Sequence, residues 1–224
     1  MFFADKFKKQ SFLVYGLGIT GRSVINFFKE NKIKSYQVWD DNIKNLYKKK
    51  RPSNLKEVLG KVNYVVLSPG ININKSKHKN QLIKYKNKII TDIDLLFLSK
   101  KKFKSIVVTG TNGKSTTCKI IYHVLKKNKF TSQIGGNIGT PILSLKIKKN
   151  SFLIIEASSF QLAYSKFIKP DYALLLNITN DHLDWHGNKL NYINSKFKIF
   201  KLQKKTNYAL LNEKLKKEFK KRNF

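Results

Sequence analysis

Short apolar runs alternate along the chain with longer stretches of helical spacing, and most of these runs end at a glycine turn or a polar residue. The predicted strands cover residues 11–15, 36–39, 63–67, 104–109, 152–155, 172–176 and 208–211. The predicted helices run to about residue 30, from 114 to about 127, and from about 190 to 202. Short strands that alternate with helices favour a parallel sheet covered on both faces. The pattern therefore predicts an α/β fold.

The chain is predicted to form two domains, because a strand followed by a glycine turn occurs twice. The first such strand leads into Gly16-Leu-Gly-Ile-Thr-Gly21, and the later one leads into a turn from Gly110 to Gly113. A lysine cluster near residues 99–102 lies between the two arrangements. We therefore expect a Rossmann-like domain over residues 1–99 and a second, nucleotide-binding domain over residues 100–224.

The composition is that of a chain with a sizeable core, since 41% of its 224 residues are hydrophobic. No apolar run is long enough to span a bilayer, and residues 1–10 do not resemble a signal peptide. The chain contains one cysteine, Cys118, so it forms no internal disulfide. We expect a cytoplasmic protein without a membrane partner.

The formal net charge of +33 has two interpretations. A surface rich in lysine attracts polyanions such as nucleic acid. Alternatively, the whole chain is enriched in lysine without a binding role. The lysines are spread along the sequence, and no nucleic-acid-binding motif accompanies them. We favour the second interpretation and expect no nucleic-acid partner.

The strongest local motif is a glycine-rich segment between a predicted strand and a predicted helix. Its glycines let several backbone N–H groups point at one phosphate, and the positive end of the helix dipole adds to this effect. A lysine at the helix start can reach the outer phosphates, and the hydroxyl that follows can bind magnesium. We assign an ATP-binding loop to Gly110, Thr111, Asn112, Gly113, Lys114, Ser115 and Thr116.

The first glycine segment is a weaker signal. Gly16, Gly18 and Gly21 follow a strand and open a helix, and Asp40 ends the next strand about 20 residues on. The spacing fits a dinucleotide site. It equally fits a site for the nucleotide part of a UDP-linked substrate, or a turn that serves packing alone.

Two further segments carry candidate metal ligands. Glu156 ends a strand that should be buried, so its carboxylate is expected in the ligand crevice as a magnesium ligand rather than on the surface. The segment 177–187 contains two histidines and two aspartates after another strand, which suggests a second metal site. Zinc would also suit such a cluster, but the lack of cysteine partners favours magnesium.

Taken together, these motifs resemble the Mur ligases, and in particular the branch that adds D-glutamate. The phosphate loop, the Gly-Gly-Asn-Ile-Gly segment and the Asp-His-Leu-Asp segment are each specific to Mur-type ligases. The matching segments run nearly end to end and comprise residues 16–21, 68–70, 91–94, 109–116, 135–139, 156, 158–161 and 180–187.

The resemblance implies an ATP- and magnesium-dependent reaction in peptidoglycan synthesis, and hence a part in cell shape and division. In this reaction UDP-N-acetylmuramoyl-L-alanine is phosphorylated on its carboxylate, and D-glutamate then attacks the acyl phosphate. The resemblance also implies a monomer. Its residue roles are a catalytic Lys114, magnesium ligands Ser115 (or Thr116), Glu156 and His182, and substrate contacts Ile19, Thr20, Asp40, Gly70, Asn137, Ser158 and Gln161.

The family also has a lysine that becomes a carbamate and serves the second magnesium ion. Lys196 matches this position with one residue fewer after His182 than expected, and Lys198 is the competing assignment. The two side chains would point about 200° apart on a helix, so only one can face the site. Around the uracil the chain departs from the family, because Asp41 and Asn42 stand where a hydroxyl residue and an arginine are common.

Family members have a third domain that binds D-glutamate. We therefore expect this chain to be a C-terminally truncated member with a partial central ATP-binding domain, and we expect it not to catalyse ligation by itself. Two alternative functions remain open at this point. One is a basic, nucleic-acid-associated P-loop NTPase, and the other is a non-catalytic remnant that binds a nucleotide.

Overall fold

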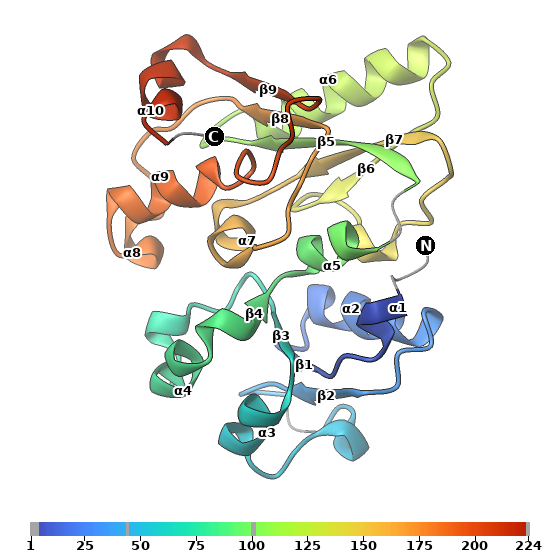
Figure 1. The fold of residues 1–224 in the computed structure, drawn as a ribbon, viewed down its shortest axis with the longest axis vertical. Helices are drawn as coiled ribbons and strands as arrows, with labels where there is room; N and C mark the ends of the chain where they lie inside the picture. Colours follow the sequence, from blue (N-terminus) through green and yellow to red (C-terminus); the bar gives the residue numbers. More distant parts are fainter. Residues whose placement is uncertain (1–4, 44, 100–101, 223–224) are drawn as a thin grey trace. The chain divides into compact units, whose positions relative to one another are not determined.

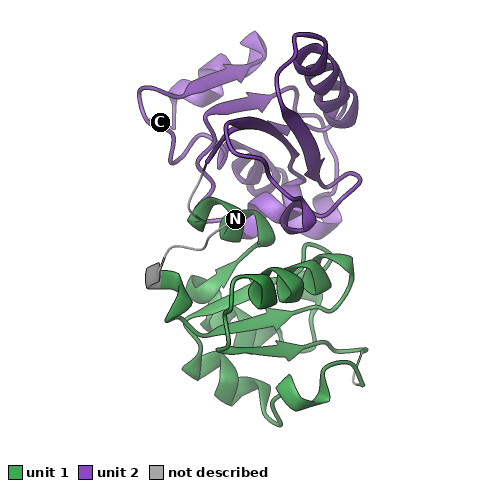
Figure 2. Cartoon of the chain, turned by 90° about the vertical axis from the view of Figure 1, so that its right-hand side faces the viewer, with its two compact units in different colours: residues 1–100 green, residues 101–224 purple. Residues whose placement is uncertain are grey.

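The computed structural model describes residues 5–43, 45–99 and 102–222. The chain divides into two compact units, unit 1 over residues 1–100 and unit 2 over residues 101–224 (Figure 2). Each unit has one sheet of parallel strands with helices around it (Figure 1), which confirms the predicted α/β fold. Residue 100, at which we predicted the second domain to begin, lies outside the described residues.

Unit 1 contains a sheet in the order β2-β1-β3-β4, and all of its strand pairs are parallel. The strands are β1 (Phe12–Tyr15), β2 (Tyr36–Trp39), β3 (Tyr64–Leu67) and β4 (Ile89–Ile90). The α-helices are α1 (Asp5–Lys8), α2 (Ile19–Glu30), α3 (Leu55–Lys61), α4 (Lys79–Lys84) and α5 (Asp92–Leu98). The 3₁₀ helices are η1 (Lys48–Lys50), η2 (Ile73–Lys75) and η3 (Lys86–Lys88).

Both faces of this sheet are covered, as its apolar strands require. The four side chains of β1 are all buried. On one face Phe12 packs against Phe28 of α2, with ring centroids 4.8 Å apart. Leu13, next along β1, points to the other face, and it and its β3 neighbour Val65 are fully buried. The carboxyl ends of the strands thus form one edge, where ligands of such sheets bind.

Polar residues at the helix starts explain where two of these helices begin. The side chain of Asn54 accepts hydrogen bonds from the backbone N–H groups of Lys56 and Glu57 at the start of α3. At the start of α5, Thr91 and Asp94 form a reciprocal capping box, and both residues are buried. Caps of this kind satisfy backbone donors that the first helical turn leaves without partners. The segment 91–94 therefore has a structural role.

Unit 2 contains a sheet in the order β6-β7-β5-β8-β9, again with parallel pairs throughout. The strands are β5 (Phe103–Thr109), β6 (Ser132–Gly136), β7 (Ser151–Glu156), β8 (Tyr172–Leu175) and β9 (Tyr208–Leu211). The α-helices are α6 (Lys114–Lys127), α7 (Ser159–Tyr164), α8 (Leu183–His186), α9 (Lys189–Phe197) and α10 (Lys216–Lys220). The 3₁₀ helices are η4 (Ile142–Ser144) and η5 (Glu213–Leu215).

Strand β5 is the centre of this unit, with two neighbours on either side. Its residues Ile106 and Val108 belong to a buried cluster with Cys118 of α6 and Ile154 of β7. The alternate residue Val107 is fully buried on the opposite face. A strand buried on both faces is fixed in position, so the loop that follows β5 starts from a rigid support.

Several elements of unit 2 differ from the sequence prediction, which did not include the short helices α7 and α8. Strand β6 was not predicted, because two of its five residues are glycine, which is depleted in strands. The helix predicted over residues 190–202 ends as α9 at Phe197. The backbone N–H of Phe200 then donates to the carbonyl of Phe197 at 3.1 Å, which is the three-residue spacing of tight turns.

Within the described residues, no helix has both the length and the apolar character needed to cross a membrane.

The glycine loop after β1 shows which of its glycines the fold itself needs. A Cβ atom on Gly21 would lie 1.8 Å from the carbonyl oxygen of Gly16, so a side chain there clashes with backbone. A Cβ on Gly18 would meet nothing within 4 Å, and its φ of −66° is allowed for any residue. Gly21 is therefore required for packing of α2 against the loop, whereas Gly18 faces open space.

We predict that Gly21→Ser destabilises unit 1 by about 2–3 kcal/mol, because the added Cβ forces the loop and α2 apart. The matched change Gly18→Ser should cost no more than about 0.5 kcal/mol, since serine is also a good N-cap residue. Urea unfolding followed by Trp39 fluorescence in a Trp185→Phe background measures unit 1 directly, because these are the only tryptophans. Equal losses for both variants would contradict this account.

Candidate nucleotide-binding site

The predicted phosphate loop lies between β5 and α6, and its two halves differ in their hydrogen bonding. The left-handed backbone of Gly113 (φ +81°) turns the chain into α6. Over the described residues, no hydrogen bond is donated by the backbone N–H groups of residues 113–116. The N–H groups of Thr111 and Asn112, in contrast, both donate to Asn177. Free N–H groups at a helix start, with the positive end of the helix dipole, suit a phosphate group.

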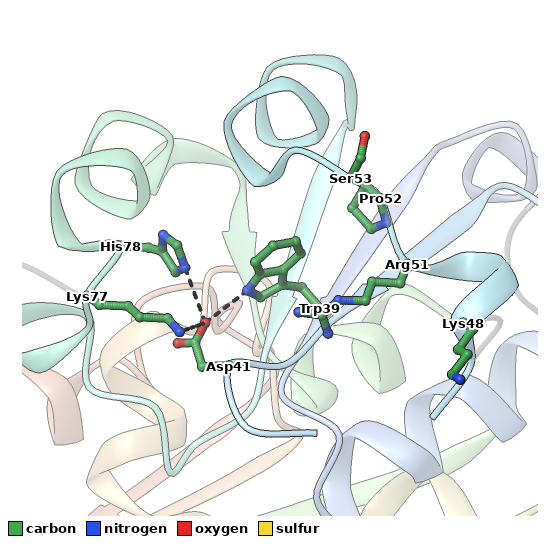
Figure 3. Close-up of a pocket in the computed structure, with 8 residues that line it drawn as sticks. All are labelled: Trp39, Asp41, Lys48, Arg51, Pro52, Ser53, Lys77 and His78. Atoms are coloured by element: carbon green, nitrogen blue, oxygen red, sulfur yellow. Dashed lines mark hydrogen bonds and ion pairs between the residues drawn. The ribbon is translucent and has the colours of Figure 1, made fainter. Parts of the chain in front are cut away.

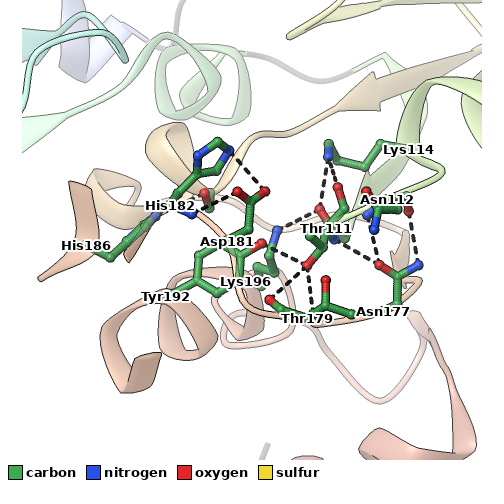
Figure 4. Close-up of polar contacts among 12 residues, drawn as sticks. Thr111, Asn112, Lys114, Asn177, Thr179, Asp181, His182, His186, Tyr192 and Lys196 are labelled. Atoms are coloured by element: carbon green, nitrogen blue, oxygen red, sulfur yellow. Dashed lines mark hydrogen bonds and ion pairs between the residues drawn. The ribbon is translucent and has the colours of Figure 1, made fainter. Parts of the chain in front are cut away.

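Two lysine side chains meet at the first carbonyl of this loop (Figure 4). The Nζ atom of Lys114 donates to the carbonyl oxygens of Gly110 (3.1 Å) and Thr111 (2.7 Å). The Nζ atom of Lys196 donates to the same Gly110 oxygen at 2.7 Å. Two cations that share one neutral acceptor repel each other, so an anion placed between them would be strongly favoured.

Lys196 is nearly fully buried, with 2% of its surface exposed. The pKa of its ammonium group is lowered to about 7, mainly by burial and also by the charge of Lys114, while Asp181 opposes the shift. The ring of Tyr192 lies 4.6 Å from its Nζ atom. The competing residue, Lys198, bonds instead to the carbonyl oxygens of Ala163 and Ser165. The contact of Lys196 with the phosphate loop supports it as the carbamate candidate.

Glu156 lies at the carboxyl end of β7, next to the phosphate loop, and is 1% exposed. Its Oε2 atom accepts a hydrogen bond from the Ser115 hydroxyl at 2.7 Å, and its Oε1 atom accepts one from Asn137 Nδ2 at 3.0 Å. Asn137 reaches this position because Gly136 passes close to β7, where a Cβ would lie 2.4 Å from the Glu156 carbonyl oxygen. A carboxylate beside a hydroxyl offers the oxygen ligands that Mg²⁺ prefers.

The segment 177–187 does not gather its histidines and aspartates at one point. His182, with a left-handed backbone (φ +51°), lies 3.3 Å from the carboxylate of Asp181 and against the ring of Phe160. His186 is buried, and its Nε2 atom pairs with the Ser159 hydroxyl at 3.0 Å. The pKa of His186 is lowered to about 4, mainly by burial and also by the charge of nearby Lys196. His186 is therefore a neutral core residue.

Across the described residues, no group of three or more His, Cys, Asp and Glu side chains could hold a metal ion. His, Cys, Asp and Glu side chains alone therefore form no such group in the segment 177–187, and the second metal site expected there stays a prediction. The role that the family resemblance implies for His182 needs no such group of side chains. In that role His182 shares a magnesium ion with a modified lysine and with substrate oxygens. That role stays a prediction.

Ser158 and Gln161, predicted to contact the substrate, form the capping box of α7. The Ser158 hydroxyl accepts from the backbone N–H of Gln161, and Gln161 Oε1 accepts from the backbone N–H of Ser158. Both side chains are buried. The structure thus explains both residues by the start of α7, and a substrate contact stays a prediction.

In unit 1, Asp40 holds the glycine loop. Its Oδ2 atom accepts the backbone N–H of Leu17 at 2.7 Å, and its Oδ1 atom accepts those of Asn42 and Ile43, each at 2.8 Å. Burial raises the pKa of this carboxyl, but the three backbone hydrogen bonds and Arg51 outweigh burial and lower it. Both oxygens are therefore engaged within the protein, which does not favour the dinucleotide interpretation. Nearby, Ile19 is 71% exposed.

A pocket of about 720 Å³ lies at the end of β2, beside this loop (Figure 3). The indole of Trp39 forms part of its wall, and the guanidinium of Arg51 lies 4.3 Å from the centre of that ring. Lys48 and Lys77 also line the pocket, and Lys77 lies 3.6 Å from the one carboxylate there, that of Asp41. Cations outnumber this carboxylate, so the pocket suits an anionic ligand. The sequence analysis assigned Asp40 to the substrate and did not identify Trp39 and Arg51 as pocket residues.

Two residues that the sequence analysis did not assign form hydrogen bonds with the predicted phosphate loop. Asn177 bonds to Thr111 and Asn112, and the hydroxyl of Tyr192 pairs with that of Thr111 at 2.9 Å. A signal was present for both. Asn177 follows a strand next to β5, and Tyr192 lies one helical turn before Lys196, on the same face of α9.

A glycine loop between a central parallel strand and a helix, with a lysine at the helix start and a buried carboxylate on the neighbouring strand, defines unit 2 as an α/β domain of the P-loop class. Comparison with known families narrows this class. The model of the Mur ligase middle domain matches residues 108–224, and that of the MurD-like N-terminal domain of Mur ligases matches residues 10–91. The chain belongs to the Mur ligase family.

Curated relatives agree with this assignment. The chain is 39% identical over 203 residues to a UDP-N-acetylmuramoylalanine–D-glutamate ligase of Wolbachia pipientis wMel, covering 87% of the chain and 40% of the relative. It is 40% identical over 217 residues to the ligase of the same name from Rickettsia prowazekii (strain Madrid E), covering 93% of the chain and 47% of the relative. The chain thus spans less than half of the length of these two relatives.

A solved structure shows the same fold. The UDP-N-acetylmuramate:L-alanyl-gamma-D-glutamyl-meso-diaminopimelate ligase from Neisseria meningitides superposes with a TM-score of 0.54 and 16% sequence identity. The match covers 95% of this chain and 75% of that structure. At this identity the similarity concerns the fold alone.

We predict that Lys196 makes stability rise with pH above neutrality. Its native pKa of about 7 lies below the unfolded value of 10.5. Between these values the unfolded chain binds a proton that the native chain lacks, so the free energy of unfolding rises with pH. Below about pH 7 both forms are protonated, and the cost of burying the charge is fully present. Lys196→Met should remove up to about 1 kcal/mol per pH unit of this slope.

The measurement is denaturant unfolding of the original chain and of Lys196→Met between pH 7.5 and 9, in buffers free of carbon dioxide so that the amine stays unmodified. If the free energy of unfolding changes with pH by the same slope in both chains, the prediction is wrong. Lys196 would then keep its ordinary pKa in the folded chain.

Proposed function

We propose that unit 2 binds Mg²⁺–ATP at its phosphate loop, and that the whole protein is the ligase that joins D-glutamate to UDP-N-acetylmuramoyl-L-alanine. One observation carries the nucleotide site. The free N–H groups of residues 113–116, the ammonium group of Lys114, and the pair Ser115–Glu156 all lie around one loop. The two substrates are proposed from the similarity to the curated D-glutamate ligases.

The proposed chemistry explains why the site is rich in positive charge. A carboxylate is a poor electrophile until one of its oxygens becomes part of a good leaving group. Transfer of the terminal phosphate of ATP to the substrate carboxylate provides that group, and the amine of D-glutamate then displaces phosphate as the amide forms. All partners are anionic, so Lys114 stabilises the charge that develops on the transferred phosphate.

The residues around the loop fit a magnesium ion. Ser115 and Glu156 offer a hydroxyl and a carboxylate that already touch each other, and both are oxygen ligands of the type that magnesium takes. When bound, the ion would neutralise phosphate charge. We propose His182 and Lys196 for a second ion, with Lys196 as a carbamate. Its burial favours the neutral amine that carbamate formation requires.

For the UDP-linked substrate we propose unit 1. Ile19 and Thr20 begin α2 beside Asp40, and Gly70 follows β3 at the same edge of the sheet. These residues are proposed for uracil and diphosphate, and Asn137 of unit 2 for the muramoyl part. The cationic pocket at Trp39 supports an anionic ligand at this end of unit 1.

A nucleic-acid-associated NTPase is not favoured. Both family models that match the chain are those of Mur ligases, and together they account for most of it. A cytoplasmic, monomeric protein remains our expectation, and the free, buried Cys118 is compatible with a reducing compartment.

We predict that Lys114→Ala weakens binding of Mg²⁺–ATP by about 10- to 100-fold, because a charge-assisted hydrogen bond contributes about 1.5–3 kcal/mol. Lys119→Ala is the matched control, since Lys119 is an exposed lysine of the same helix, one turn further on. Calorimetric titration of the purified chain with Mg²⁺–ATP gives both affinities. The control should bind within two-fold of the original chain.

Equal affinities for the two lysine variants would refute the phosphate-loop assignment. The substrate assignment is tested separately, by titration with UDP-N-acetylmuramoyl-L-alanine and, in parallel, with a DNA duplex at rising salt. Binding of the nucleotide sugar together with only weak, salt-sensitive DNA binding is the expected result. Tight DNA binding without nucleotide-sugar binding would favour the NTPase instead.

A further inference from the structure

The side chain of Asn177 is bonded to the backbone of the phosphate loop at three points (Figure 4). Its Oδ1 atom accepts from the backbone N–H of Thr111 at 3.1 Å and from that of Asn112 at 2.9 Å. Its Nδ2 atom donates to the carbonyl oxygen of Asn112 at 3.1 Å. The main-chain carbonyl of Asn177 also accepts from Thr111 N–H at 3.0 Å. Asn177 thus pairs with the loop much as a neighbouring strand would.

Only a carboxamide of this length fits these three partners. Two N–H groups require an acceptor, and the carbonyl of Asn112 requires a donor at the other end of the same side chain. The partners therefore also fix which end of the Asn177 amide carries oxygen. An aspartate keeps the acceptor and loses the donor, and an alanine loses both.

We propose that Asn177 is a positioning residue that holds the first half of the phosphate loop so that its second half stays open to phosphate. The proposal rests on the proposed nucleotide-binding function. Thr111 and Asn112 direct their N–H groups to Asn177, whereas those of residues 113–116 remain free in the described structure. Without this link the loop, which contains Gly110 and Gly113, has backbone freedom that nucleotide binding must then remove.

The loop has a second attachment, which should keep the Asn177 variants folded. The Thr111 hydroxyl accepts from the backbone N–H of Thr179 at 3.0 Å and pairs with the buried hydroxyl of Tyr192 at 2.9 Å. Loss of Asn177 should therefore loosen the loop at Asn112, whose backbone N–H has its hydrogen bond with Asn177, more than at Thr111.

The experiment uses the full chain, labelled with ¹⁵N, and the variants Asn177→Ala and Asn177→Asp. Asn128→Ala is the control. It removes an exposed asparagine that bonds to the carbonyl of Val124 at the far end of α6. Two quantities are measured for each chain, namely the hydrogen-exchange rate of the Asn112 amide without nucleotide and the Kd for Mg²⁺–ADP.

For Asn177→Ala we expect exchange at Asn112 at least ten-fold faster and a Kd at least ten-fold higher, with exchange in β5 and β7 unchanged. Asn177→Asp keeps the acceptor and should keep Asn112 exchange within about three-fold of the original, while its added negative charge weakens Mg²⁺–ADP binding in a salt-dependent way. The control Asn128→Ala should leave both quantities within two-fold. If Asn177→Ala fails to fold, Asn177→Asp alone decides. Exchange of the Asn112 amide at least ten-fold faster than in the original chain, in a folded Asn177→Asp variant, then overturns the proposal.

The proposal is also wrong if Asn177→Ala binds Mg²⁺–ADP as tightly as the original chain, whatever its exchange rate. That result would leave the nucleotide site itself intact. If instead the original chain binds no Mg²⁺–ADP while Asn112 is protected, the proposed function fails, and the positioning role falls with it.

Discussion

The phosphate site depends on one constraint, which is that the first turn of an α-helix cannot bond its own N–H groups. Some helices of this chain meet that constraint with a cap from their own sequence, such as Asn54 for α3 or Ser158 and Gln161 for α7. Helix α6 has a glycine at this position and no side-chain cap. Its free N–H groups are directed into the loop, where a phosphate can satisfy them. The uncapped N–H groups, together with the ammonium group of Lys114 beside them, support the proposal that this helix start binds phosphate.

Side chains around the loop hold it in place although the N–H groups at the start of α6 have no cap. Asn177 and Tyr192 attach the loop to neighbouring elements, so its conformation does not rely on the bound phosphate. The charges are arranged on either side, with Lys114 and Lys196 at the Gly110 carbonyl and Glu156 held by Ser115. The repulsion between the two lysines is the part of this arrangement that a bound anion would relieve.

Local sequence patterns predicted much of this site. The features that were not predicted depend on contacts between residues far apart in the sequence. Strand β5, the glycine turn and α6 were predicted closely, because apolar spacing and glycines mark them within one short segment. Asp40 was assigned to a ligand, and the structure shows that it also accepts a hydrogen bond from the backbone N–H of Leu17 in the glycine loop, a contact that depends on the distance between β1 and β2. Asn177 was not assigned, because its partners lie 65 and 66 residues away in the sequence. His186 was grouped with metal ligands, since burial among aromatic rings cannot be recognised from its neighbours in the chain.

The central claim is that the N–H groups of residues 113–116 receive the nucleotide phosphates, while those of Thr111 and Asn112 stay bonded to Asn177. An ¹⁵N–¹H NMR titration of the chain with Mg²⁺–ADP observes all of these groups at once. The account predicts large downfield proton shifts for residues 113–116, from new hydrogen bonds to phosphate, and small shifts for Thr111 and Asn112. Saturable binding that leaves residues 113–116 unshifted would place the nucleotide elsewhere and contradict the account.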